Sequence, residues 1–122
     1  MKVTSYQDLI VWQRAMDLVV AVYKMTLLLP GSERRGLAEQ LRRAAVSVPS
    51  NIAEGHARIH RKEFLHFISI ARASVKEIET QLLIAERIGY AEHEEIASAL
   101  ALCDQISRML RTMRIKLAAG AA

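Results

Sequence analysis

The sequence predicts an all-α protein, an antiparallel up-and-down four-helix bundle, and three observations support that prediction. Apolar residues recur at spacings of three and four, which places them on one face of a helix. Five glycines and two prolines in 122 residues leave four long uninterrupted segments, which short turns would join. No stretch alternates apolar and polar residues for long enough to indicate a strand. We therefore expect one domain over residues 1–122, with a short N-terminal lead-in and a frayed tail at residues 118–122.

The first predicted helix ends where Pro30 and Gly31 favour a turn. Its apolar residues at helical spacing, which we expect to face the core, are Leu9, Trp12, Met16, Val19, Tyr23 and Leu27. Their spacing places all six on one side of the helix.

The second predicted helix carries apolar residues from Leu37 to Ile52, ends at Gly55 and contains Pro49. A proline inside a helix lacks an amide donor and clashes with the carbonyl four residues earlier, here that of Ala45. We therefore predict a kink or a break near Pro49, with nearby short polar side chains bonding the freed backbone groups. The alternative interpretation is a bent polar surface that contacts a partner.

The third predicted helix is the longest, with apolar residues from Phe64 to Ala85 before Gly89, and the fourth carries them from Ile96 to Leu117. Acidic residues open the fourth helix and basic residues close it, as the helix dipole favours. The third helix has further apolar residues beside its main stripe: Leu65, Phe67, Ile70 and Ile84. Because a monomer would leave part of this broad apolar surface exposed, we predict a closed homo-oligomer.

Basic residues concentrate between residues 34 and 62, where seven of them accompany two acidic residues and give a net charge of +5. The seven are Arg34, Arg35, Arg42, Arg43, Arg58, Arg61 and Lys62. Arginine suits phosphate because its planar guanidinium donates paired hydrogen bonds. The cluster predicts one nucleic-acid-binding surface, and the alternative is a solvated face that serves only solubility.

Helical geometry and the distribution of aromatic residues limit what this surface can do. Arg42 and Arg43 differ by about 100° around a helix axis, so we expect one to face the ligand and the other to pair with Glu39 or Glu54. No aromatic residue lies between residues 34 and 62, so binding to RNA or DNA should be directed at the backbone and weakly selective.

A second basic run has a spacing of three in the last helix: Arg108, Arg111 and Arg114. Compensation of the helix dipole is our main interpretation of this run. An extension of the phosphate-binding surface is the alternative.

The sequence contains no Gly-rich phosphate loop, nucleophile elbow or dinucleotide fingerprint. The nearest approach to a metal set is His56, His60, Glu63 and His66, which do not supply ligand spacing on one unbroken helix. Cys103 lies at an apolar position of the fourth helix and is interpreted as a core residue. We therefore expect a protein without catalytic residues, metal or cofactor.

The remaining features favour a cytoplasmic protein. A single cysteine fits a reducing compartment, and the opening residues lack the long apolar segment of a signal peptide. Charges interrupt every apolar stretch before it reaches the roughly 20 residues that a membrane span needs, so we expect no membrane partner.

Several segments together resemble a known family: Tyr6–Leu9, Val11–Ala15, the sequence from Gln40 to Gly55, Phe64-Leu65, Ala71–Ser74 and Glu77–Leu82. They are similar to the four-helix-bundle proteins encoded in intervening sequences of bacterial 23S rRNA genes. The resemblance implies a homopentamer without known enzymatic activity. It also implies kinship with the accessory variability determinant proteins of diversity-generating retroelements, which are basic pentamers that bind nucleic acid and a reverse transcriptase. Ala57 and His60 depart from the family pattern, and His60 deprives the third helix of a good N-cap.

Two hypotheses about function follow. The first is a non-enzymatic oligomeric bundle that acts as a nucleic-acid-associated accessory protein and binds the RNA or DNA backbone, with a reverse transcriptase or another protein as a further partner. The alternative is a protein–protein adaptor or structural ring that meets an acidic protein.

Overall fold

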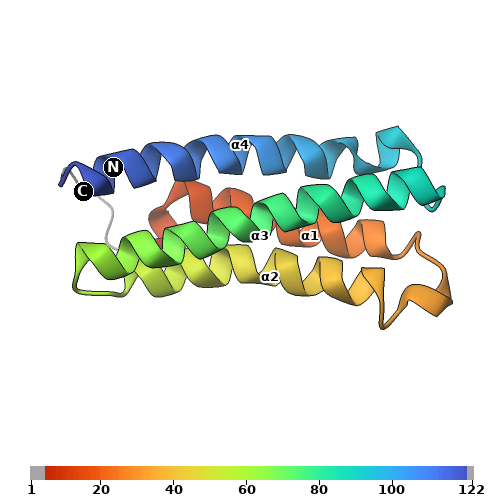
Figure 1. The fold of residues 1–122 in the computed structure, drawn as a ribbon, viewed down its shortest axis with the longest axis horizontal. Helices are drawn as coiled ribbons and strands as arrows, with labels where there is room; N and C mark the ends of the chain where they lie inside the picture. Colours follow the sequence, from red (N-terminus) through yellow and green to blue (C-terminus); the bar gives the residue numbers. More distant parts are fainter. Residues whose placement is uncertain (1–4, 121–122) are drawn as a thin grey trace.

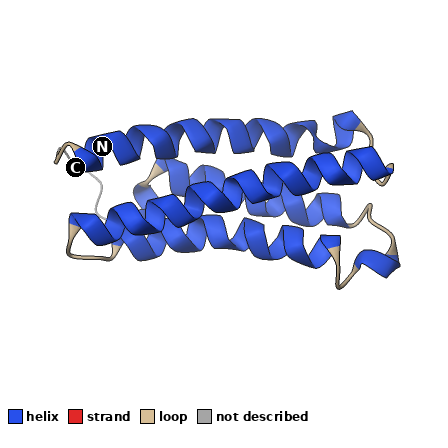
Figure 2. Ribbon diagram, in the orientation of Figure 1, coloured by secondary structure: helices blue, strands red, loops and turns tan. Residues whose placement is uncertain are grey.

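A computed structural model of the chain describes residues 5–120, and these residues form an antiparallel four-helix bundle (Figure 1). Its elements in chain order are η1 (Tyr6–Asp8), α1 (Ile10–Thr26), η2 (Gly31–Glu33), α2 (Leu37–His56), α3 (Arg61–Ile88) and α4 (His93–Ala118). Short turns join α2 to α3 and α3 to α4, a longer connection that contains η2 joins α1 to α2, and residues 5–120 include no strand (Figure 2). The predicted fold class is confirmed.

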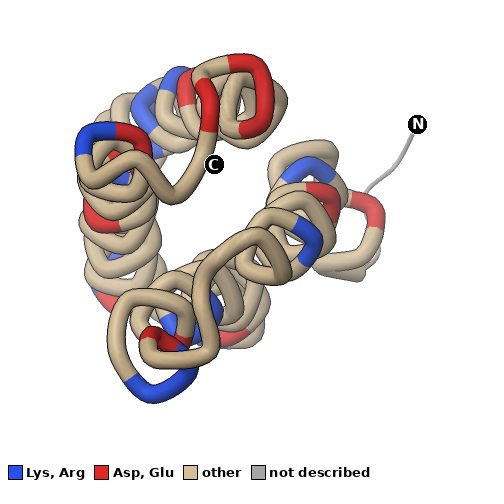
Figure 3. The backbone as a smooth tube through the Cα atoms, turned by 90° about the vertical axis from the view of Figure 1, so that its right-hand side faces the viewer, with Lys and Arg blue, Asp and Glu red and all other residues tan. Residues whose placement is uncertain are grey.

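Each long helix packs against two neighbours, in the closed order α1–α2–α3–α4–α1, around one central axis (Figure 3). The interface of α2 with α3 is the most extensive, and that of α1 with α4 is the least. The turn between α2 and α3 lies at the same end of the bundle as the C-terminus of α4 (Figure 1). We call this the corner end, and we call the opposite end, which carries η2, the η2 end.

One apolar core contains residues from all four helices, and among its fully buried side chains are Leu18, Leu41, Ile78 and Ile106. The faces predicted for the second, third and fourth helices are the faces that enter this core. None of the helices between residues 5 and 120 is both long enough and apolar enough to cross a bilayer.

The predicted core face of the first helix is only partly correct, because Leu9, Trp12 and Val19 are half-buried and pack against the core, whereas the other three predicted residues do not. The buried side chains of α1 are Val11, Ala15, Leu18, Val22 and Met25. Met16, Tyr23 and Leu27 were expected inside but are 41%, 45% and 83% exposed. α1 carries two apolar stripes with the same helical period, and periodicity alone does not distinguish which of them faces the core.

α2 is a single continuous helix through Pro49, so the helix is not broken there. Two short polar residues beside the proline, Ser47 and Asn51, bond within the bundle, whereas Ser50 is exposed. The side-chain amide of Asn51 donates to the Ser47 carbonyl at 2.7 Å, and the Ser47 and Ser74 hydroxyls lie 2.9 Å apart. These bonds join α2 to itself and to α3, which does not favour the interpretation of this segment as a polar contact surface.

The corner between α2 and α3 depends on a close approach at Gly55. A Cβ atom there would lie 2.8 Å from Phe64 Cδ1 and 2.9 Å from Phe67 Cβ. His60 is the N-cap of α3 and makes no side-chain capping bond, as its departure from the family pattern predicts. At the far end of α3, Gly89 adopts a φ of 93°, a left-handed conformation that glycine tolerates and that ends the helix.

The two predicted chain ends lie partly outside the described residues. α4 continues to Ala118, the first residue of the predicted frayed tail, and residues 119–120 form a turn. Residues 121–122 and the lead-in residues 1–4 lie outside the described part of the chain.

Candidate nucleic-acid interface

The seven basic residues predicted to form one surface lie at opposite ends of the bundle. Four of them form the η2 group: Arg34, Arg35, Arg42 and Arg43. The other three form the corner group: Arg58, Arg61 and Lys62. Between Arg42 and the last residue of α2, His56, the helix rises by about 21 Å. Because α2 is unbroken, it holds the two groups apart, and the prediction of a single surface is wrong.

Contacts within the η2 group hold two of its four side chains. The Arg43 guanidinium lies 3.2 Å from a carboxylate oxygen of Glu39. The expectation that one of the two adjacent arginines pairs with a nearby glutamate is therefore confirmed. Arg42 donates to the Arg34 carbonyl at 3.4 Å, and its Cζ lies 6.0 Å from the centre of the Tyr23 ring. The side chains of Arg34 and Arg35 are exposed.

The Glu33 side chain anchors the loop that carries Arg34 and Arg35. The Glu33 carboxylate accepts the Leu37 backbone N–H at 3.0 Å and the Tyr90 hydroxyl at 2.9 Å. The bond from Leu37 and, second, the bond from Tyr90 lower the pKa of the Glu33 carboxyl. The same bond to Glu33 raises the pKa of Tyr90. Glu33 thus joins the start of α2 to the turn between α3 and α4.

In the corner group, Arg58 is the residue that carboxylates of the described chain hold. Arg58 lies 3.6 Å from Glu54 and 4.0 Å from Glu63, and its Cζ sits 4.8 Å from the centre of the Phe67 ring. Arg61 and Lys62 are exposed, and neither forms an ion pair with any residue between 5 and 120.

The corner group is continuous with the end of α4. A Cβ atom on Gly120 would lie 3.3 Å from a guanidinium nitrogen of Arg61, so the end of α4 rests against the start of α3. Near this end α4 carries four basic residues, which we call the α4 basic run: Arg108, Arg111, Arg114 and Lys116. Arg108 pairs with Asp104 at 3.0 Å, whereas the other three form no ion pair within the described chain.

Dipole compensation is the main prediction for Arg108, Arg111 and Arg114, and the fold in addition places the end of α4 beside the corner group, as the alternative of an extended phosphate-binding surface requires. Residues 105–118 contain no Asp or Glu, and this is the sequence signal for unpaired basic side chains near the end of α4. Because the η2 group and the corner group are close in sequence, the sequence favours placing them on one surface. The antiparallel fold instead brings the corner group next to residues more than 40 positions away.

The single cysteine of the chain lies in the core. Cys103 is buried, and desolvation, assisted by the charge of Glu79, raises its pKa to about 12, so its thiol stays neutral at physiological pH. No three His, Cys, Asp or Glu side chains within residues 5–120 gather in a way that could hold a metal ion.

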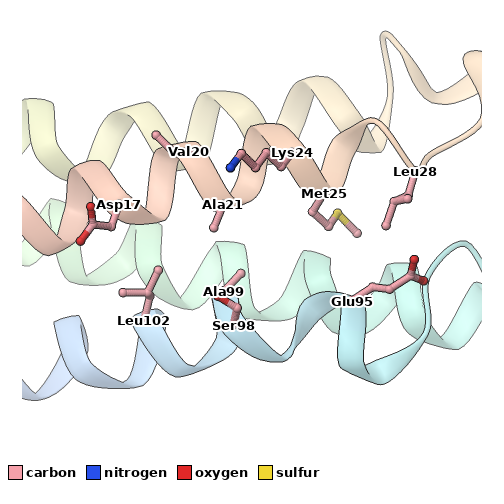
Figure 4. Close-up of a pocket in the computed structure, with 10 residues that line it drawn as sticks. All are labelled: Asp17, Val20, Ala21, Lys24, Met25, Leu28, Glu95, Ser98, Ala99 and Leu102. Carbon is pink, nitrogen blue, oxygen red and sulfur yellow. The ribbon is translucent and has the colours of Figure 1, made fainter.

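The second apolar stripe of α1 forms an exposed row, and three of its four members were expected in the core. Met16, Val20, Tyr23 and Leu27 follow one another at helical spacing and are between 41% and 83% exposed. Val20 also borders a groove of about 520 Å³ between α1 and α4, in which side chains of the two helices face each other (Figure 4). Of the residues predicted to widen the apolar surface of α3, Leu65, Phe67 and Ile70 are half-buried and only Ile84 is exposed.

A comparison with solved structures finds a similar fold in a bacterial protein. That protein, of unknown function and from the S23 ribosomal protein family, comes from Bacteroides thetaiotaomicron, and its crystal structure matches with a TM-score of 0.80. The match covers 86% of this chain and 98% of that chain at 21% sequence identity, which shows a shared fold alone. Comparison with curated proteins gives no significant match.

The family comparison is more direct, because it rests on the sequence itself. The family model for the 23S rRNA-intervening sequence protein matches residues 7–112. This span includes α1, α2 and α3 whole and most of α4. The match therefore agrees with the fold and with the segments that sequence analysis singled out, and the chain belongs to the 23S rRNA-intervening sequence protein family.

Proposed function

We propose that this chain is a non-enzymatic oligomeric accessory protein that binds the backbone of RNA or DNA, and that the corner end is its principal contact surface. One observation carries the proposal. Five exposed basic side chains at this end lack an ion-pair partner among residues 5–120: Arg61, Lys62, Arg111, Arg114 and Lys116. Side chains without carboxylate partners are free to neutralise phosphates, which release counterions on binding.

The composition of the corner end favours phosphate over bases as the ligand. Phe64 and Phe67, its nearest aromatic residues, are half-buried, and Phe67 already lies under the Arg58 guanidinium. Without exposed aromatic rings among the basic side chains, bases have no stacking platform. Contacts should therefore position the nucleic acid through its phosphates and discriminate weakly between sequences.

The second apolar stripe of α1 supports assembly of several copies of this chain. Exposed apolar rows of this kind mark interaction surfaces, and a stripe at helical spacing suits packing against another helix. We propose a closed homo-oligomer that buries this stripe, with five subunits as the family resemblance implies. A ring would repeat the corner end around its axis and strengthen the positive field without further residues.

Charge reversal at the corner end, measured by RNA and duplex-DNA binding over a range of salt concentrations, tests the proposal. The test variant reverses Arg61, Lys62, Arg111 and Arg114 to Glu. Its matched control reverses four exposed basic residues at the η2 end that form no ion pair within the described chain: Lys24, Arg34, Arg35 and Arg87. The net charge of the two variants is identical.

We expect the corner variant to lose binding to both nucleic acids and the control to retain most of it, with helicity unchanged in both and the oligomeric state of each variant measured by sedimentation. If the wild-type protein binds neither nucleic acid at low salt, the proposal fails. The adaptor that meets an acidic protein would then become the better hypothesis. Equal losses in both variants would show that only the net charge matters and would remove the assignment to the corner end.

A further inference from the structure

A pocket of about 540 Å³ lies at the corner end, where the start of α1 and the start of α3 meet the ends of α2 and α4. Its volume falls within the range of roughly 300–1,000 Å³ that is typical of sites for small molecules. All four long helices contribute side chains to its lining. We call it the corner pocket, and its lining includes Ile10, His56, Phe64, Met109, Met113 and Lys116.

Most of the lining of the corner pocket is aliphatic. Ile10 lies on one side, and Met109 and Met113 lie one helical turn apart on α4. Methionine side chains are unbranched and polarizable, so these two can adapt to the shape of a flexible ligand. The ring of Phe64 already packs edge-to-face with His56, with the ring centres 6.1 Å apart. The lining therefore favours an alkyl chain over a planar aromatic ring.

The polar groups at the corner pocket favour an anion. Lys116 and Thr112 are exposed, and their spacing of four residues places them on the same face of α4. Lys116 forms no ion pair with any residue between 5 and 120. Among the described residues that line the pocket, none is Asp or Glu. Asp8, which precedes the pocket in sequence, bonds to the Ser5 backbone N–H in the capping box of η1.

The groove between α1 and α4 near the η2 end provides a comparison. Its volume of about 520 Å³ is similar, and it also has a lysine in its lining, Lys24 (Figure 4). Asp17 and Glu95 line the same groove, however, and their carboxylates would repel an anionic ligand. The corner pocket thus differs from this groove in the sign of its charge and not in its size.

We propose that the corner pocket binds an aliphatic carboxylate of the fatty-acid class. The alkyl chain lies among Ile10, Met109 and Met113, and its removal from water supplies most of the binding free energy. The carboxylate accepts hydrogen bonds from the Lys116 ammonium and the Thr112 hydroxyl, which fix its orientation at the rim. Of these residues only Lys116 also belongs to the surface proposed for nucleic acid, so the pocket is testable without nucleic acid.

NMR spectra of the methionine methyl groups of the full-length protein report on the occupancy of the corner pocket. The probe is decanoate, kept below the concentration at which it forms micelles. We expect the signals of Met109 and Met113 to shift saturably. The signal of Met25, which lines the groove between α1 and α4, is the control and should stay in place.

Two further probes test recognition of the carboxylate. 1-Decanol has the same chain without a charge, and decyltrimethylammonium has the opposite charge. We expect decanoate to bind about three to five times more tightly than 1-decanol, as an exposed ion pair allows, and decyltrimethylammonium to bind most weakly. Lys116→Gln should remove the preference for decanoate over 1-decanol. Lys24→Gln, in the lining of the other groove, should leave it unchanged.

A second pair of variants tests the position of the alkyl chain. Ile10→Glu places a carboxylate at a 49% exposed site in the pocket lining and should weaken decanoate binding by about tenfold or more. Ile115→Glu makes the same change at a 54% exposed site on α4 outside the lining, and should have little effect. Thermal melts establish that each variant folds, and Lys116→Gln keeps the test valid if Ile10→Glu does not.

Three outcomes would overturn the proposal. Equal affinity of the wild-type protein for decanoate and 1-decanol would show that the carboxylate is not recognised. Shifts of all methionine signals without saturation would show a detergent effect in place of a site. Sedimentation in which decanoate dissociates the oligomer, together with Met109 and Met113 signals that change on dilution, would show that a second copy of the chain covers the pocket.

Discussion

The two ends of the bundle carry similar numbers of basic residues but use them differently. At the η2 end, Arg43 pairs with Glu39, Arg42 contacts the Arg34 carbonyl, and Glu33 fixes the intervening loop. At the corner end, only Arg58 of the corner group is held by carboxylates. The two ends therefore differ little in formal charge. They differ in whether neighbouring groups hold the basic side chains in place.

The apolar surface differs between the ends as well. The exposed stripe of α1 runs toward the η2 end, where Leu27 is the most exposed of its members at 83%. Assembly through this stripe would cover part of the η2 end and leave the corner end accessible. One end would then serve contact between subunits and the other contact with a ligand.

The salt dependence of binding gives the largest contrast between the two ends. Each phosphate neutralised on duplex DNA contributes about −0.9 to the slope of log K against log salt. Reversing Arg61, Lys62, Arg111 and Arg114 should flatten this slope by about 3 to 4 units, and reversing the four η2-end residues by about 1 or less. Fluorescence anisotropy at several salt concentrations measures both slopes. Equal slopes for the two variants would contradict the division of roles.

Assembly should respond to a single charge in the α1 stripe. Val20→Asp places a carboxylate on a 53% exposed apolar site, and we expect the oligomer to dissociate into folded monomers, because burying an unpaired charge in an interface is costly. Ile88→Asp, at a 56% exposed site on α3, is the matched control and should leave assembly unchanged. Sedimentation velocity measures the oligomeric state of both variants. An intact oligomer with Val20→Asp would show that the interface does not include the α1 stripe.

The corner end should also depend more on close packing than the η2 end. Gly55→Ala introduces a methyl group 2.8 Å from Phe64 Cδ1, and overpacking of this kind should lower the free energy of unfolding by about 2 kcal/mol. Gly31→Ala is the control at the η2 end, since no atom lies within 4 Å of its added Cβ. Urea unfolding measures the free energy of unfolding of both variants. Similar values would show that the corner accommodates the added methyl group without loss of stability.

The fold was predictable because each helix carries a clear period, and the buried faces of α2, α3 and α4 follow it. The buried face of α1 was not predictable, because its two apolar stripes have the same period and only the neighbouring helices decide which one is buried. The basic residues of the candidate site were predictable from composition. Their grouping in space was not, because sequence distance is a poor guide to spatial distance in an antiparallel bundle.

The smallest expected effect concerns Glu33, which orders the η2 end through its bonds to Leu37 and Tyr90. Because these bonds lower the pKa of Glu33, the carboxylate stabilises the fold above the ordinary glutamate pKa of about 4.3, and this contribution is lost as the pH falls through the lowered value. Glu33→Gln should therefore be slightly less stable than the wild type at neutral pH and equally stable in acid. Glu77→Gln, at an exposed site on α3, should show no such difference at either pH. Urea unfolding at neutral and acidic pH tests this, and a stability gap for Glu33→Gln that persists in acid would assign the effect to side-chain shape and not to charge.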